Sequence, residues 1–141
     1  MKEYFETFFP AGHNMRILLA DDHRTNLELM AFCLEEHGFD NILMAGNGKE
    51  ALEQYQESND EIIVVVSDVQ MPVMTGLELV RNLRSKPDTA EIPVVMLTAR
   101  DFAIEDSQKK ELNISACVSK PFSPRELLQS VEEVLKESVA V

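Results

Sequence analysis

The feature that most constrains the fold is a run of five β-branched apolar residues at 62–66, which leads directly into Ser67 and Asp68. A strand with one face in water would alternate apolar and polar residues, so this run predicts a strand buried on both faces, as in a parallel sheet. Pro72 cannot donate to a sheet ladder and limits further pairing. The pattern therefore places the carboxylate of Asp68 at the C-terminal end of a central parallel strand.

Four more short apolar segments predict the other strands, at 16–20, 42–45, 92–97 and 116–118. Between and after them we expect helices over 24–37, from Asn47 onward, from a capping box at Thr75–Glu78, over 101–112 with weaker patterning, and from a second capping box at Ser123–Glu126. Alternation of five strands with five helices is typical of βαβ units. It predicts a doubly wound α/β fold whose parallel sheet carries helices on both faces.

The length of 141 residues predicts one domain, which we assign to residues 15–141. Residues 1–14 form an N-terminal extension that holds four of the nine aromatic residues and ends in a linker-like Pro-Ala-Gly-His-Asn stretch. We expect either a short helix docked on the domain or on a partner, or a flexible terminus, and the frequent looseness of chain ends favours the flexible terminus.

The formal net charge of −12 disfavours non-specific binding to nucleic acid or to an anionic membrane, because such binding relies on Lys and Arg. No signal peptide and no membrane-spanning apolar run is visible, so we expect a cytoplasmic protein. Cys33 and Cys117 lie far apart among apolar residues, which favours two buried, reduced thiols.

Polar side chains follow four of the five predicted strands: Asp21 and Asp22 the first, Asp68 the third, Thr98 the fourth and Lys120 the fifth. The ends of parallel strands share one sheet edge, so we expect these groups to converge. Each alone has an ordinary interpretation as a cap, a turn residue or a surface lysine, but together they indicate a site. Three close carboxylates require a cation, and oxygen ligands favour Mg²⁺. Lys120 and Thr98 suit a phosphoryl group in transfer to a carboxylate.

These residues resemble the response regulator receiver domain of two-component signalling, the CheY-like superfamily, over about residues 15–136. The resemblance is carried by Asp21-Asp22, by the segment Asp-Val-Gln-Met-Pro-Val-Met-Thr-Gly at 68–76, by Leu-Thr-Ala at 97–99 and by Lys-Pro-Phe at 120–122. It implies a flavodoxin-like fold with strand order 2-1-3-4-5 and a cis bond before Pro121.

The resemblance also implies a role for each site residue. Asp68 is the phospho-acceptor, Thr98 hydrogen-bonds the phosphoryl group once it is present, and Lys120 pairs with the Asp68 carboxylate and then with the phosphoryl oxygens. Mg²⁺ is held by Asp22, Asp68 and the backbone carbonyl of Gln70, and by Asp21 mainly through water. Gln70 and Arg100 flank the site at positions that tune dephosphorylation in the family.

The chain departs from the family pattern in three places. Cys117 stands where Tyr or Phe usually turns inward as the Thr moves, so the coupling of the site to the surface differs. Asn113-Ile114 replaces the usual Gly-Ala, and Asn tolerates the left-handed backbone of such a turn. Thr75 replaces a common Asp and caps the following helix equally well.

As partners, the resemblance implies a histidine kinase or a histidine phosphotransfer protein as donor. The output is an unknown protein, a homodimer through the face of the fourth helix, fifth strand and fifth helix, or onward phosphotransfer. Such a domain is no enzyme beyond its own phosphorylation and dephosphorylation.

Three alternatives stay open at this point. The first is a pseudo-receiver that binds partners without switching, which Cys117 favours. The second is a phosphohydrolase with an aspartyl-phosphate intermediate, although Gln70 stands where such enzymes typically carry a second Asp. The third is a flavin-binding domain, although Asp21 and Asp22 would repel a phosphate at the first strand.

Overall fold

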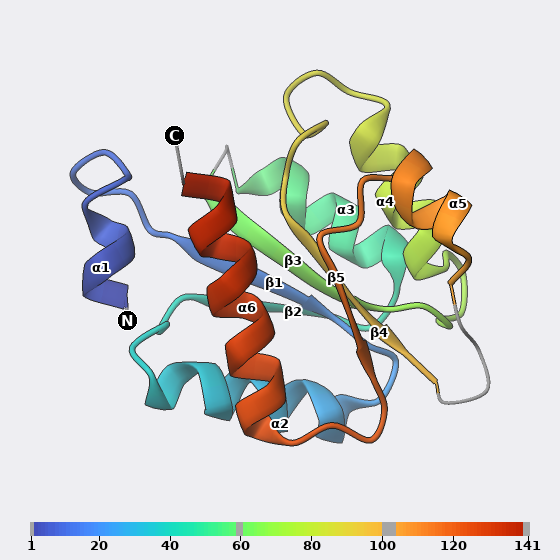
Figure 1. The fold of residues 1–141 in the computed structure, drawn as a ribbon, viewed down its shortest axis with the longest axis horizontal. Helices are drawn as coiled ribbons and strands as arrows, with labels where there is room; N and C mark the ends of the chain where they lie inside the picture. The colour runs from blue at the N-terminus through green and yellow to red at the C-terminus, as the bar shows by residue number, and fades with distance from the viewer. Residues whose placement is uncertain (1, 59–60, 100–103, 140–141) are drawn as a thin grey trace.

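The computed structural model, which describes residues 2–58, 61–99 and 104–139, is built on one five-stranded parallel sheet (Figure 1). Its strands are β1 (Arg16–Ala20), β2 (Ile42–Ala45), β3 (Ile62–Asp68), β4 (Val94–Thr98) and β5 (Ala116–Ser119). They lie in the order β2-β1-β3-β4-β5, and every neighbouring pair is parallel. The predicted fold class and strand order are therefore confirmed.

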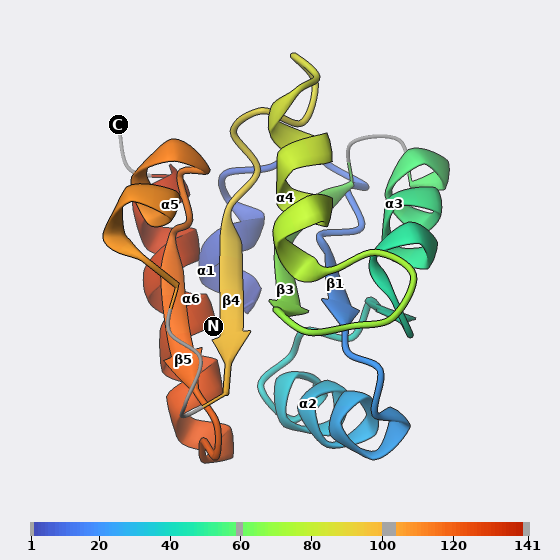
Figure 2. The same ribbon diagram turned by 90° about the vertical axis from the view of Figure 1, so that its right-hand side faces the viewer.

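The helices are α1 (Lys2–Glu6), α2 (Arg24–Glu36), α3 (Gly48–Glu57), α4 (Gly76–Arg84), α5 (Asp106–Glu111) and α6 (Pro124–Val139). Helices α2 and α6 cover one face of the sheet, whereas α3 and α4 cover the other, as the turned view in Figure 2 shows. The helix predicted over 101–112 is much shorter, at 106–111, and positions 101–103 lie outside the described residues. The strand predicted from residue 92 begins at Val94, after Pro93.

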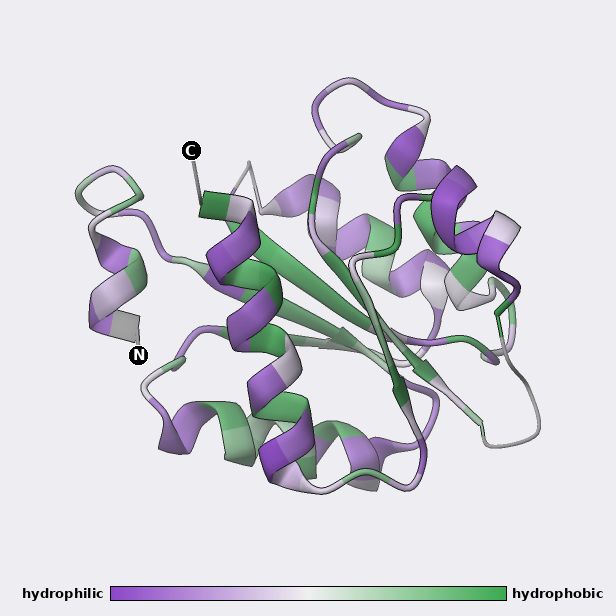
Figure 3. Ribbon diagram, viewed as in Figure 1, coloured by the Kyte–Doolittle hydropathy of each residue, from purple (hydrophilic) through white to green (hydrophobic). Residues whose placement is uncertain are grey.

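The core has two layers, one on each side of the sheet. All seven residues of β3 are buried, as the unbroken apolar run predicted. Alternate β3 residues enter opposite layers: Val64 and Val66 pack toward α2 and α6, and Val65 packs toward α3 and α4. Figure 3 shows the result, with strands hydrophobic along their length and hydrophilic residues on the helices.

Local signals end and begin the elements as expected. Thr75 and Glu78 form the predicted capping box at the start of α4. Gly38, with φ of 93°, ends α2 in the left-handed conformation that a C-terminal glycine supplies. Asn113 adopts φ of 50° after α5, which confirms that the turn survives the replacement of the family's glycine.

The N-terminal extension lies against the domain at the end of the sheet where the strands begin, away from their C-termini (Figure 1). Phe5 on α1 is completely buried and meets Phe39 with ring centroids 6.2 Å apart. Phe5 also belongs to the same apolar cluster as Leu34 and Ile63. The short helix thus contributes a core side chain to the layer formed by α2 and α6.

The expectation of two buried thiols is wrong for one of them. Cys33 on α2 is buried, but Cys117 is exposed. Its strand, β5, lies at the edge of the sheet, and of its four residues only Val118 is buried. Apolar neighbours in the sequence therefore did not decide which face of the edge strand Cys117 would occupy.

None of the helices in the described parts of the chain combines the length and the apolar character needed to span a bilayer.

Candidate functional site

The site is built at the C-terminal ends of β1, β3 and β5, of which β1 and β3 are neighbours and β5 is separated from β3 by β4. Asp21 and Asp22 follow β1, Asp68 ends β3, and Lys120 follows β5. Register brings these ends together, because Ala20 pairs with Ser67 on one side of β3 and Asp68 pairs with Leu97 on the other. The predicted convergence of the two acidic segments and the lysine is observed.

Lys120 links the two most buried carboxylates. Its Nζ lies 2.9 Å from Oδ2 of Asp68 and 3.3 Å from Oδ2 of Asp21. The Asp21 side chain is fully buried and that of Asp68 is 9% exposed, whereas Asp22 is 30% exposed. The site is thus a pocket with two acids at its floor, one lysine between them and a third acid at the rim.

Burial and charge act against each other on these groups. Burial raises the pKa of Asp68, and the charges of Asp21 and Asp22 raise it further, although the hydrogen bond and charge of Lys120 lower it in part. For Lys120, burial alone would lower the pKa, but its bonds to Asp68 and Asp21 outweigh burial and leave the pKa raised. Lys120 is therefore positively charged at neutral pH. A further positive charge near Asp68 would stabilise its ionised carboxylate.

The backbone around Asp68 is held tightly by α4. The amide of Gly76 donates to the carbonyl of Val69 at 2.9 Å, and the amide of Val69 donates to Leu97 at 3.1 Å. A Cβ on Gly76 would collide with the backbone carbonyl of Asp68. A residue without a side chain is thus required for α4 to begin this close to the end of β3.

The remaining predicted residues occupy three different situations. Thr98 ends β4, is buried, and its carbonyl accepts a hydrogen bond from the Lys120 amide at 2.7 Å. Gln70 follows β3 with an exposed side chain. Arg100, predicted to flank the site, lies outside the described residues. The bond between Lys120 and Pro121 is cis, as the resemblance implied.

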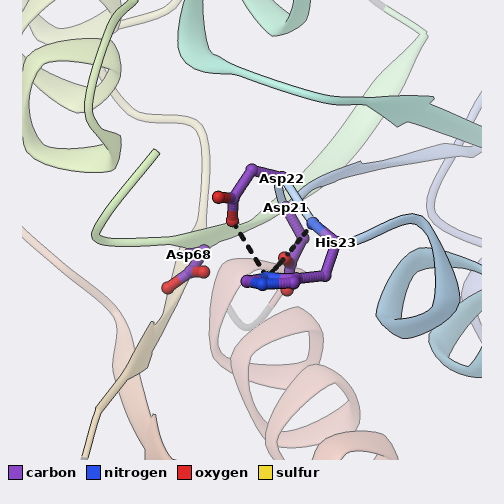
Figure 4. Close-up of side chains that lie close together, drawn as sticks. All are labelled: Asp21, Asp22, His23 and Asp68. Carbon is purple, nitrogen blue, oxygen red and sulfur yellow. Dashed lines mark hydrogen bonds and ion pairs between the residues drawn. The ribbon is translucent and has the colours of Figure 1, made fainter. Parts of the chain in front are cut away.

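Sequence reasoning missed His23, which lies in the same cluster (Figure 4). Its Nδ1 lies 3.2 Å from Oδ1 of Asp22 and 3.4 Å from Oδ1 of Asp21. One signal could have found it, since His23 immediately follows the acidic pair and precedes α2.

The donor set fits a divalent cation. Among the described residues, Asp21, Asp22, His23 and Asp68 each offer one ligand atom, and these atoms all lie within 4.8 Å of one another. Carboxylate oxygens are the ligands that Mg²⁺ prefers, and two of the three acids are withdrawn from water. The acidic cluster is of the kind that holds Mg²⁺ in receiver domains.

Residues 17–132 match the family described as the response regulator receiver domain, and the chain belongs to that family. A receiver is a signalling module rather than an enzyme, and the family in general receives its phosphate through a kinase. The acidic pocket and Lys120 are consistent with a phospho-accepting member.

Individual relatives agree. The chain is 37% identical over 125 residues to the "Transcriptional regulatory protein CpxR homolog" of Haemophilus influenzae, covering 89% of this chain and 52% of that protein. It is 32% identical over 121 residues to "Chemotaxis protein CheY1" of Helicobacter pylori, covering 86% of this chain and 97% of that protein. The chain thus spans about half the length of the transcriptional regulator, but nearly all of the chemotaxis protein.

A solved structure shows the same fold. The chemotaxis response regulator CheY4 of Vibrio cholerae is 30% identical and superposes with a TM-score of 0.76, covering 85% of this chain and 98% of that one. The signal receiver domain of a histidine kinase from Syntrophus aciditrophicus is 29% identical, with a TM-score of 0.77 over 87% of this chain and 91% of that one. Similar domains therefore occur both alone and as parts of larger proteins.

Proposed function

We propose that this chain accepts a phosphoryl group on Asp68 from a phosphohistidine and signals by changing how it binds other proteins. The observation that carries the proposal is the salt bridge between Lys120 and the buried carboxylate of Asp68, which belongs to the acidic cluster. A carboxylate oxygen of Asp68 attacks phosphorus, the bond from phosphorus to the donor nitrogen breaks with its electron pair, and an acyl phosphate forms.

The residues around Asp68 divide the work. Lys120 already donates a hydrogen bond to the Asp68 carboxylate, so its positive charge would lie close to the oxygens of an incoming phosphoryl group. Asp21, Asp22, Asp68 and the Gln70 backbone carbonyl would hold Mg²⁺, which supplies charge that neutralises those oxygens. The buried hydroxyl of Thr98, on the neighbouring strand, would donate to the phosphoryl group and draw the end of β4 toward it.

The donor protein must reach past the N-terminal end of α2, which begins beside the pocket. Leu29 and Phe32 are both 63% exposed on this helix, one turn apart, although its other face is buried. A helical domain of a histidine kinase or phosphotransfer protein could cover this apolar pair while presenting its phosphohistidine to Asp68. The output would use the α5–β5–α6 face, through a partner or a second copy of the chain.

A second candidate is a binding module that no longer switches. The exposed thiol of Cys117 favours it, since the family's inward-turning aromatic residue is absent from that position. Both candidates retain the acidic pocket. They differ in that only the first changes its surface after phosphorylation.

The test is to incubate the protein with Mg²⁺ and acetyl phosphate and to record the intact mass. We expect a gain of one phosphoryl group in the wild type and none in Asp68→Asn. Hydrogen exchange of the phosphorylated protein then separates the candidates, since a receiver that switches should change protection in β4 and β5. A wild type that gains no mass would contradict the proposal, and steady turnover of small phosphate esters would indicate an enzyme instead.

Replacing Leu29 and Phe32 by Glu tests the docking surface separately. Phosphotransfer from a protein donor should slow, whereas labelling by acetyl phosphate should not change, because neither side chain belongs to the pocket. Equal transfer from the protein donor to both forms would contradict the proposed surface.

A further inference from the structure

His23 adds a nitrogen donor to a cluster whose other donors are carboxylate oxygens (Figure 4). Its Nδ1 lies 3.2 Å from Oδ1 of Asp22 and 3.4 Å from Oδ1 of Asp21, whereas Lys120 contacts the Oδ2 atoms of Asp21 and Asp68. Ligands of one small cation are separated by distances of this order, because each lies about 2.0–2.2 Å from the ion. The imidazole is thus near enough to share an ion with the acidic pair.

The backbone of His23 is held next to Asp21, whereas its imidazole ring is exposed to solvent. His23 precedes α2 in an extended conformation, and its amide donates to Oδ1 of Asp21 at 2.8 Å. The ring itself is 68% exposed. The exposed ring is thus held beside the acidic pair by its backbone, and its Nδ1 belongs to the group of ligand atoms that lie within 4.8 Å of one another.

Nitrogen and oxygen donors select different cations. Carboxylates, carbonyls and water suit both Mg²⁺ and Mn²⁺, whereas imidazole binds first-row transition ions and contributes little to Mg²⁺, which keeps oxygen ligands and water. Because the oxygen ligands suit both ions, a nitrogen ligand is the group in this cluster that would separate Mn²⁺ from Mg²⁺. We propose that His23 is a ligand of the pocket cation and shifts its selectivity from Mg²⁺ toward divalent transition ions, represented by Mn²⁺. This inference rests on the proposed function, in which the same pocket binds the cation that supports phosphorylation.

A competing explanation of the same contacts makes a different prediction. If the ring only forms an ion pair with Asp21 and Asp22, it competes with every divalent cation for those carboxylates. Removing it would then strengthen Mg²⁺ and Mn²⁺ binding alike. If His23 is a ligand, its removal weakens Mn²⁺ far more than Mg²⁺, so the ratio of the two dissociation constants decides between the explanations.

The experiment titrates Mg²⁺ and Mn²⁺ by calorimetry, at one fixed pH, into chelator-treated wild type, His23→Ala and His23→Asn. The Asn variant replaces the nitrogen donor by an amide oxygen and keeps a residue that favours the start of a helix. His37→Ala is the matched control, because His37 lies at the opposite end of α2 and contacts the Cys33 carbonyl. Loss of a group that supports a metal site typically costs about tenfold or more in affinity.

We expect the preference for Mn²⁺ over Mg²⁺ to fall by about this factor in both His23 variants and to persist in His37→Ala. Pulsed electron paramagnetic resonance of bound Mn²⁺ should show coupling to an imidazole nitrogen in wild type and His37→Ala, and none in the His23 variants. An unchanged preference, or a wild type without nitrogen coupling, would overturn the assignment.

Failure of this inference is distinguishable from failure of the proposed function. A wild type that binds Mg²⁺ and becomes phosphorylated, but shows no effect of His23, leaves the proposed function intact and removes His23 as a ligand. A wild type that binds neither cation removes both.

Discussion

The pocket at the end of β3 and the edge formed by α5 and β5 contrast sharply in how they are built. Every residue of β3 is buried, and its final side chain is the proposed phospho-acceptor. In β5 only Val118 is buried, and α5 contributes no buried residue. Regions with few buried contacts open more easily than central strands. Under the proposed function, the phosphoryl group would be accepted at the end of a fully buried strand and read out at an edge of the domain that has few buried residues.

The two regions also differ in how they follow the family pattern. The pocket has each acid and the lysine that the receiver resemblance implies, whereas the edge carries Cys117 and the pair Asn113-Ile114 instead of the usual residues. Changes at the edge should therefore alter output without altering phosphorylation. The following predictions test that separation.

The largest effect is expected from Lys120→Met, which removes the cation between Asp68 and Asp21 while keeping an unbranched side chain only one atom shorter. Loss of one preorganised group that stabilises developing charge typically costs about a hundredfold in rate. The initial rate of labelling by acetyl phosphate, followed by intact mass, measures the loss. Lys109→Met on α5 is the control and should label at the wild-type rate; equal rates for both variants would remove Lys120 from the mechanism.

Gly76→Ala should lower the stability of the protein by disturbing the backbone at Asp68. The new Cβ would collide with the Asp68 carbonyl, and overpacking of this kind costs about 1–3 kcal/mol. Urea unfolding measures the free energy. Gly46→Ala is the matched control, because a Cβ there would meet only Glu50 Oε2, at an ordinary 3.6 Å. A Gly76→Ala protein as stable as the control would show that α4 can move away from β3.

Asp68→Asn should stabilise the protein at neutral pH in the presence of a chelator. Burial, with the charges of Asp21 and Asp22, raises the pKa of Asp68, so the folded state keeps this proton to a higher pH than the unfolded state. Its ionisation therefore costs stability as pH rises from the ordinary Asp range through the raised pKa, and the full cost is present above it.

The advantage of Asp68→Asn should accordingly shrink to nothing as pH falls below the ordinary Asp range. Thermal unfolding at a series of pH values measures this, with the exposed Asp88→Asn as control. A variant less stable than wild type at neutral pH would indicate that the bond to Lys120 outweighs the burial of the charge.

The smallest effect on phosphorylation is expected from Cys117→Phe, which places an aromatic residue on the exposed side of β5. Labelling by acetyl phosphate should be unchanged, because Cys117 is exposed and does not belong to the acidic cluster, while the protection of β5 in hydrogen exchange after phosphorylation should change. A slower labelling rate would show that the edge and the pocket are coupled more closely than the burial pattern indicates.

The sequence was sufficient for the sheet and for the placement of the three acids and Lys120, because long apolar runs and strand ends follow simple rules. It was insufficient where packing between distant segments decides. The docking of Phe5 on Phe39 depends on an aromatic contact across the fold, and the exposure of Cys117 depends on β5 being an edge strand. His23 escaped attention because its one signal, its place directly after the acidic pair, does not show which way the side chain turns.

Borohydride trapping after reaction with acetyl phosphate and Mg²⁺ tests the central claim most directly. The hydride reduces an aspartyl phosphate to homoserine, so peptide mapping shows which carboxylate carried the phosphate. We predict homoserine at position 68 and unmodified aspartate at positions 21 and 22. Homoserine at either of those positions, or at none of the three, would contradict the account.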